Sequence, residues 1–235
     1  MTALARELTA DYERVRETKD SALHDAFVQR LLSSDEPDVV QAHYELLRDQ
    51  RNDVLYRLVR SAFGKRGRVA ARFLDGLVLR EKAPAMRADI LLLLGVVNQP
   101  SALVLAREVL EEGAWELRQR GCSVLGWMGQ PEDVALLAAR PLTDSNETVR
   151  GTAATALRQL GRRMLVASRG DLLTALRDSL EKETADSVAA RVVLTAQSMI
   201  NKRFGLVEEI EQATISGDVQ SARTKCLRAL KRATR

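Results

Sequence analysis

The sequence predicts an all-α protein: a right-handed α-solenoid of antiparallel helix pairs with atypical repeats at both ends. The first observation is a repeat, because Arg87, Arg118 and Arg150 recur after 118 − 87 = 31 and 150 − 118 = 32 positions. A period of this length is typical of stacked helical units, each too thin to bury its own apolar face. The second is composition: hydrophobic residues make up 46% but aromatic residues only 4%, and no Val/Ile/Thr-rich alternating run indicates a sheet.

The N-terminal part of the expected single domain, residues 1–235, contains end elements. Apolar residues at helical spacing predict capping helices within 1–36, and Pro37 is well placed to begin a degenerate repeat over 37–64. In the central repeats an acidic residue of the inter-helix turn precedes an arginine by six positions. The turn of the repeat over 37–64 lacks this acid–arginine pair, as expected of an end unit that faces water. The basic turn at 64–67 either links two helices, which we favour, or binds a phosphate.

The central part, residues 65–161, contains the three clear repeats. Each is expected to be a pair of helices: 68–80 with 84–97, 101–111 with 115–128, and 133–140 with 147–160. Ser101 and Asp144 are suitable N-terminal caps, since their short side-chain oxygens can accept hydrogen bonds from unpaired backbone amides.

The C-terminal part is expected to be a degenerate repeat over 162–202, followed by two helices over 203–235. The final helix is basic, because no acidic residue follows Asp218 while the cationic residues of this patch recur: Arg223, Lys225, Arg228, Lys231 and Arg232. The whole chain carries a formal net charge of +4, so the rest is close to neutral. In order of preference, the basic helix is a solvated face, a site for an acidic protein, or a nucleic-acid site.

The segment Asp144-Ser-Asn-Glu-Thr-Val-Arg150 and the apolar helix after it resemble the second half of a HEAT repeat. In that family an acidic residue in the turn between two helices precedes an arginine by six positions, and such pairs stack into a ladder. The corresponding ladder residues here are Glu81, Arg87, Glu112, Arg118, Asp144 and Arg150. The alternative is three ordinary surface ion pairs. Both interpretations make these residues structural rather than catalytic.

The sequence contains no convincing catalytic, cofactor or metal site, so we expect no enzymatic activity and no cofactor. Its two histidines, His24 and His43, lie on separate expected helices. Cys122 and Cys226 are expected to be free thiols in a reducing cytoplasm, since there is no secretory leader and no long apolar run. The alternative is a nucleic-acid-binding or DNA-repair protein similar to the HEAT-like alkylpurine DNA glycosylases, for which Trp115 is one of the few suitable aromatic residues.

The resemblance implies that a protein partner binds the concave surface formed by the second helix of each pair. The partner-binding candidates are Trp115, Gln119, Trp127, Glu147 and Arg158. For the two tryptophans the alternative is packing between repeats. Glycines at 95, 126 and 151 suggest that another group approaches these helices closely. We therefore expect a cytoplasmic, bacterial-type scaffold, adaptor or inhibitor.

Overall fold

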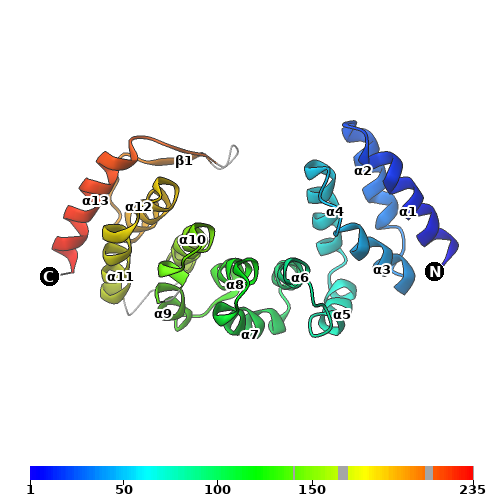
Figure 1. Ribbon diagram of the computed structural model, residues 1–235, viewed down its shortest axis with the longest axis horizontal. Helices are drawn as coiled ribbons and strands as arrows, with labels where there is room; N and C mark the ends of the chain where they lie inside the picture. The colour runs from blue at the N-terminus through cyan, green and yellow to red at the C-terminus, as the bar shows by residue number, and fades with distance from the viewer. Residues whose placement is uncertain (140, 164–168, 210–213, 235) are drawn as a thin grey trace. The chain divides into compact units, whose positions relative to one another are not determined.

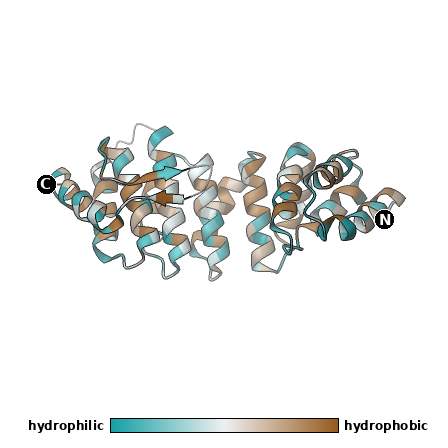
Figure 2. Cartoon of the chain, turned by 90° about the horizontal axis from the view of Figure 1, so that it is seen from above, coloured by the Kyte–Doolittle hydropathy of each residue, from teal (hydrophilic) through white to brown (hydrophobic). Residues whose placement is uncertain are grey.

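The computed structural model describes the whole chain except residues 140, 164–168, 210–213 and 235 (Figure 1). Almost all of the regular structure in the described part is helical, and consecutive helices pack on one another, so the predicted all-α solenoid class is confirmed. The chain divides into two compact units, Met1–Ser101 (unit 1) and Ala102–Arg235 (unit 2). Each unit is described by itself. In both, hydrophobic (brown) and hydrophilic (teal) residues alternate along the helices (Figure 2).

Unit 1 is built from six helices, and each packs on helices that are one or two places away in the sequence. Three of them begin at a side-chain cap: Thr2, Asp20 and Asn52 accept hydrogen bonds from backbone amides of α1, α2 and α4. Prolines begin α3 and α6, where the missing N–H costs nothing. The bounds are α1 (Ala3–Arg16), α2 (Ser21–Leu31), α3 (Pro37–Leu46), α4 (Asp53–Lys65), α5 (Arg68–Leu77) and α6 (Pro84–Val96).

The basic turn of unit 1 is a structural joint between helices. Arg66 is buried and donates hydrogen bonds to the carbonyl oxygens of Leu31 and Ser34, at 2.5 and 2.7 Å, and to the Asp35 carboxylate at 2.7 Å. The next residue, Gly67, has a φ of 53°, which favours glycine at this position. The arginine fork therefore satisfies backbone carbonyls of its own unit, as the linking interpretation requires.

Unit 2 contains two layers of helices (Figure 1). Helices α8, α10 and α12 pack side by side in what we call the second layer, with α7, α9 and α11 in the first layer, and α13 packs on α11 and α12. The bounds are α7 (Pro100–Glu108, beginning at the end of unit 1), α8 (Trp115–Met128), α9 (Asp133–Ala138), α10 (Glu147–Arg163), α11 (Arg169–Lys182), α12 (Asp186–Ile200) and α13 (Val219–Ala233), with short 3-10 turns at Val109–Glu111 and Pro141–Thr143.

Small residues let the helices of unit 2 approach closely. A Cβ atom added to Gly126 of α8 would lie 3.0 Å from the Cα atom of Ala156 on α10, and one added to Gly151 would lie 3.0 Å from the Arg191 side chain. The close approach expected at these glycines therefore comes from neighbouring helices of the same unit. It gives no evidence of a partner.

Gly121 gives the first testable prediction. A Cβ atom there would lie 2.9 Å from the carbonyl oxygen of Ala106 and 2.8 Å from the Val109 side chain, so backbone must shift to admit it. We expect Gly121→Ala to destabilise unit 2 by about 1–3 kcal/mol, although alanine is the better helix former. Gly76→Ala on α5 is the matched control, because nothing lies within 4 Å of its added Cβ atom. Chemical denaturation should show opposite signs for the two variants; equal small effects would contradict the packing argument.

The helix expected over 203–216 is wrong, because this segment forms an antiparallel hairpin of β1 (Val207–Glu209) and β2 (Thr214–Ser216). β-branched residues occupy the strands, and Glu208 lies opposite Ile215 in the register. Glycines at both ends, Gly205 and Gly217, have φ angles of 105° and 115°, which are unfavourable for other residues. These glycines set the chain direction into and out of the hairpin, and together with Thr214 and Ile215 were the available sequence signal.

Both predicted N-caps are also wrong. Helix α7 already begins at Pro100, and the Ser101 hydroxyl instead donates to the Asp75 carboxylate at 2.7 Å. Asp144 accepts the backbone N–H of Asn146 at 2.8 Å, and it is the Asn146 side chain that accepts from Thr148 at the start of α10. The cap lies two residues later because Asp144 is used to order the turn itself.

Candidate functional site

The ladder arginines of unit 2 join successive inter-helix turns. Arg118 donates to both carboxylate oxygens of Asp144 at 2.7 and 2.9 Å, and to the carbonyl oxygens of Glu112 and Gly113 at 2.8 Å. Each such arginine therefore binds the backbone of the turn that precedes it and the carboxylate of the next repeat. The acid six positions earlier contributes its carbonyl group, and the carboxylate partner comes from farther along the chain.

Arg150 repeats this arrangement with an acid that the sequence pattern missed. It donates to Glu183 at 2.6 and 2.7 Å and to the carbonyl oxygens of Asp144 and Ser145 at 2.8 and 3.1 Å. Burial is the largest single influence on Glu183 and opposes its ionisation. The hydrogen bonds and charge of Arg150, together with the backbone N–H groups of Ala185 and Thr184, outweigh burial and hold the pKa of this carboxyl below its usual value. The pattern missed Glu183 because Ala189, not arginine, follows it by six positions.

The ladder residues of unit 1 differ in their exposure. Glu81 accepts hydrogen bonds from Arg48 at 2.8 Å and from the Tyr44 hydroxyl at 3.2 Å, again across a repeat. The Arg48 side chain is 44% exposed, so this pair is much more exposed to solvent than the pairs of unit 2. Arg87 lies on α6 and Glu112 follows the 3-10 turn of unit 2; both are engaged in polar interactions. All six predicted ladder residues therefore have structural partners.

The partner-binding candidates of unit 2 lie on α8 and α10. Trp115 is 39% exposed and Trp127 is 41% exposed, while Gln119 is half-buried between them. Neither tryptophan is thus fully packed between repeats. Twelve residues separate them, which places them about 120° apart around the helix axis at about 100° per residue. They are two separate contact points, and Glu147 is exposed at the start of α10.

Arg158, the last of these candidates, is buried and already forms an ion pair within the chain. Its guanidinium lies 2.7 and 3.0 Å from the two carboxylate oxygens of Glu208, on strand β1. Figure 1 shows the hairpin beside α12, on the side that faces away from α11. The hairpin base is held there because the Gln197 side chain of α12 donates to the carbonyl oxygen of Leu206 at 3.2 Å and accepts from the backbone N–H of Phe204 at 2.8 Å.

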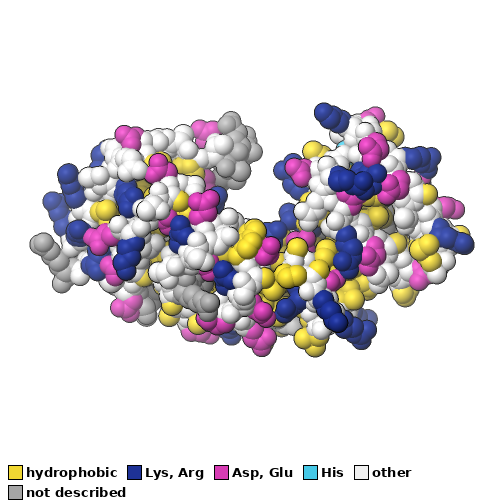
Figure 3. Space-filling view, in the orientation of Figure 1, with side chains coloured by type: hydrophobic (Ala, Val, Ile, Leu, Met, Phe, Trp, Pro, Cys, Tyr) yellow, Lys and Arg dark blue, Asp and Glu magenta, His cyan; other side chains and the backbone are white. Residues whose placement is uncertain are grey.

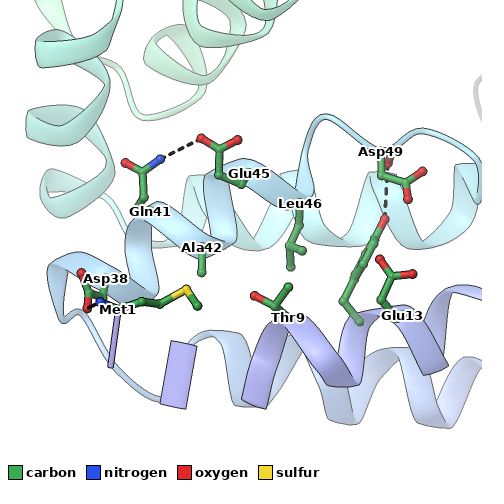
Figure 4. Close-up of a pocket in the computed structure, with 10 residues that line it drawn as sticks. Met1, Thr9, Glu13, Asp38, Gln41, Ala42, Glu45, Leu46 and Asp49 are labelled. Carbon is green, nitrogen blue, oxygen red and sulfur yellow. Dashed lines mark hydrogen bonds and ion pairs between the residues drawn. The ribbon is translucent and has the colours of Figure 1, made fainter. Parts of the chain in front are cut away.

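A cavity of about 420 Å³ lies between α1 and α3 of unit 1 (Figure 4). Its wall is apolar at Ala42 and Leu46, and carboxylates stand at its rim. These carboxylates are already paired: Asp49 with Arg16 and Arg51, Glu45 with Arg48, and Asp38 with the amino group of Met1. The charges of these carboxylates are therefore paired within unit 1.

Both cysteines are free and buried. Burial raises the pKa of both the Cys122 and Cys226 thiols to about 12, which keeps them protonated at neutral pH. Across the described residues, no three His, Cys, Asp or Glu side chains gather in a way that could hold a metal ion. Within the same residues, no helix has the length and apolar character needed to cross a membrane.

The basic patch on α13 is partly structural. Arg223 donates to the carbonyl oxygen of Leu180 at 2.7 Å, and Lys231 pairs with Glu181 at 2.8 Å, so both hold the end of α11. The remaining members, Lys225, Arg228 and Arg232, are exposed. Lys and Arg side chains gather along this edge of unit 2 (Figure 3).

Comparisons with known proteins identify the repeats. A search of the curated proteins finds no match to the chain. A scan against protein families matches residues 71–158 to the family of HEAT repeats. That range contains Arg87, Arg118 and Arg150, the arginines of the predicted ladder. Residues 71–158 therefore belong to the HEAT-repeat family, as the ladder residues predicted.

Proposed function

We propose that this protein is a non-catalytic scaffold, adaptor or inhibitor that binds a protein partner on the second layer of unit 2. HEAT repeats are generally protein-interaction scaffolds. The observation that carries the proposal is that α8 packs its apolar residues inward yet leaves two tryptophans about two-fifths exposed. Tryptophan is enriched among the residues that dominate binding energy at protein interfaces.

The polar residues of the repeats support a binding role over catalysis. The ladder arginines are engaged with backbone carbonyls and carboxylates, and both thiols are buried. A catalytic residue is expected to have a shifted pKa and to lie in a cleft that a substrate can enter. The side chains with strongly shifted pKa values here, such as Cys122 and His43, are buried in packed interiors instead.

Nucleic-acid binding, including a DNA-repair role, is the second candidate. It is favoured by the three exposed cations of α13. However, the groove of an alkylpurine DNA glycosylase combines aromatic, basic and acidic side chains in one place. Arg118 is committed to Asp144, and the two tryptophans point in different directions around α8. We therefore rank this role below protein binding.

A Trp115→Ala variant tests the proposed function. The partner is first captured from native lysate with the full chain, identified, purified and titrated against each variant. We expect Trp115→Ala to weaken binding about 30-fold, as loss of a hot-spot residue of about 2 kcal/mol would do. The matched control is Leu136→Ala on α9, which removes an apolar side chain of similar exposure, 44%, from the first layer. Equal affinities for the Trp115 and Leu136 variants would place the interface elsewhere.

A further inference from the structure

Three arginines line the seam between α10 and α12 on the second layer of unit 2. Arg158 and Arg162 are on α10, and Arg191 on α12 lies against the same face, because its side chain covers Gly151 and its guanidinium is 3.5 Å from the Thr155 hydroxyl. The positions 151, 155, 158 and 162 are three or four residues apart, which puts them on one side of the helix. We call Arg158, Arg162 and Arg191 the arginine seam.

The members of the arginine seam differ in what neutralises them. Arg158 has the carboxylate of Glu208, whose side chain is itself 32% exposed. Arg162 donates to the Ser198 hydroxyl at 3.0 Å, and Arg191 has the long contact to Thr155; both hydrogen bonds are exposed. In the part of the chain that the structure describes, neither Arg162 nor Arg191 forms an ion pair with a carboxylate. Arg162 and Arg191 thus flank Arg158, whose guanidinium is already paired with a carboxylate.

Glu208 shows which ligand fits the seam. It presents a carboxylate from an extended strand, and both oxygens lie within 3.0 Å of one guanidinium nitrogen. Thr155 and Arg162 are separated by seven residues, or about 10 Å along the helix. An extended chain covers this distance in about three residues. Alternate side chains of an extended segment share one face, so carboxylates four residues apart can reach Arg191 and Arg162 together.

We propose that the arginine seam binds an acidic, extended polypeptide segment, and that Glu208 of the hairpin occupies its central position in the free protein. This proposal rests on the proposed function and names the chemistry of the partner. The partner segment supplies carboxylates to Arg162 and Arg191 and competes with Glu208 for Arg158. A polypeptide fits better than a nucleic acid, because the group seated there is a carboxylate on a strand. Among the residues that the structure describes, no exposed aromatic side chain lies on the seam for a base to stack on.

The test uses a ten-residue fluorescein-labelled peptide with glutamate at every second position, followed by fluorescence anisotropy with the full chain. Glu208→Gln keeps the shape of the side chain and removes its charge, so it should bind the peptide about three- to tenfold more tightly than wild type. Arg162→Gln and Arg191→Gln should each weaken binding by a similar factor. The matched control is Glu209→Gln, an exposed acid on the opposite face of β1, which removes the same charge without contacting Arg158.

The direction of the Glu208→Gln effect separates this proposal from general damage, since a disrupted hairpin or lost fold would not strengthen binding. Unfolding midpoints of all four variants check that each is folded. The proposal is overturned if Glu208→Gln binds no more tightly than Glu209→Gln, if the arginine variants bind as wild type does, or if an oligothymidylate of equal charge binds at least as tightly as the peptide. A wild-type-like response of Trp115→Ala to the purified partner would instead contradict the proposed function, so the two failures are distinguishable.

Discussion

Replacing Arg150 with alanine is expected to destabilise unit 2 by about 3 kcal/mol, at the lower end of the range for breaking buried ion pairs. Glu183 is almost fully buried, with a side-chain exposure of 2%, whereas Arg150 is 17% exposed and still reaches water. The variant leaves this carboxylate without its guanidinium partner. It also removes the donor to the carbonyl oxygens of Asp144 and Ser145, which ties two turns together. Urea unfolding monitored by circular dichroism measures the loss.

Two comparisons isolate the buried charge as the cause. Adding Glu183→Gln to Arg150→Ala keeps an acceptor for the backbone amides of Thr184 and Ala185 but removes the charge, and should recover about 1 kcal/mol or more. Arg48→Ala breaks a pair whose arginine is 44% exposed and should cost about 0–1 kcal/mol. If Arg150→Ala lowers the free energy of unfolding as little as Arg48→Ala does, the ladder does not stabilise unit 2.

The pH dependence of the same variant follows from Glu183. Because the folded protein holds the pKa of this carboxyl below its ordinary value of 4.5, the pair stabilises the fold above that pH. The contribution is lost as the pH falls through the lower, folded-state pKa. The difference between wild type and Arg150→Ala should therefore be largest near neutrality and should shrink in acid.

The repeats could be recognised from the sequence because their signal is periodic and local. The arginines recur at a fixed spacing, and Pro37 and Pro84 stand at the helix starts that the pattern predicted. Both signals are local to one repeat. Each repeat carries an apolar face at helical spacing, and a helix can begin with proline because the N–H at that position needs no partner. The ladder partner of Arg150 depends instead on which turn stacks on which, so Glu183 could not be found from a spacing of six.

The candidate site was harder to predict because it depends on contacts between distant parts of the chain. Arg158 has the helical position of an exposed residue, yet Glu208, fifty positions away, buries it. The exposure of Arg158 was expected from its position on the helix 147–160 alone, and that position carries no information about a strand fifty residues away. The exposure of Trp115 and Trp127 likewise depends on how closely the next repeat approaches α8. Small residues such as Gly126 permit that approach, but periodicity does not measure it.

Acidification is expected to destabilise unit 1 through His43. This residue is fully buried; its Nε2 lies 2.9 Å from the carbonyl oxygen of Val59, and its Nδ1 accepts a hydrogen bond from Arg66 at 3.1 Å. Burial, assisted by the charge of Arg66, lowers the pKa of His43 to about 3 from its usual 6.5. The imidazole is therefore neutral in the folded protein, with the proton on Nε2 and no room for a second one on Nδ1.

Because the unfolded chain takes up the proton on His43 at a higher pH than the folded protein does, stability falls as the pH drops below about 6.5. By pH 5 the loss from this one residue should reach about 2 kcal/mol. His43→Gln offers an amide donor and acceptor of similar reach and never titrates, so its unfolding free energy should change less over this interval. Chemical denaturation at several pH values between 7 and 5 compares the two proteins. Parallel curves for wild type and His43→Gln would mean that His43 is not the group whose protonation opposes folding.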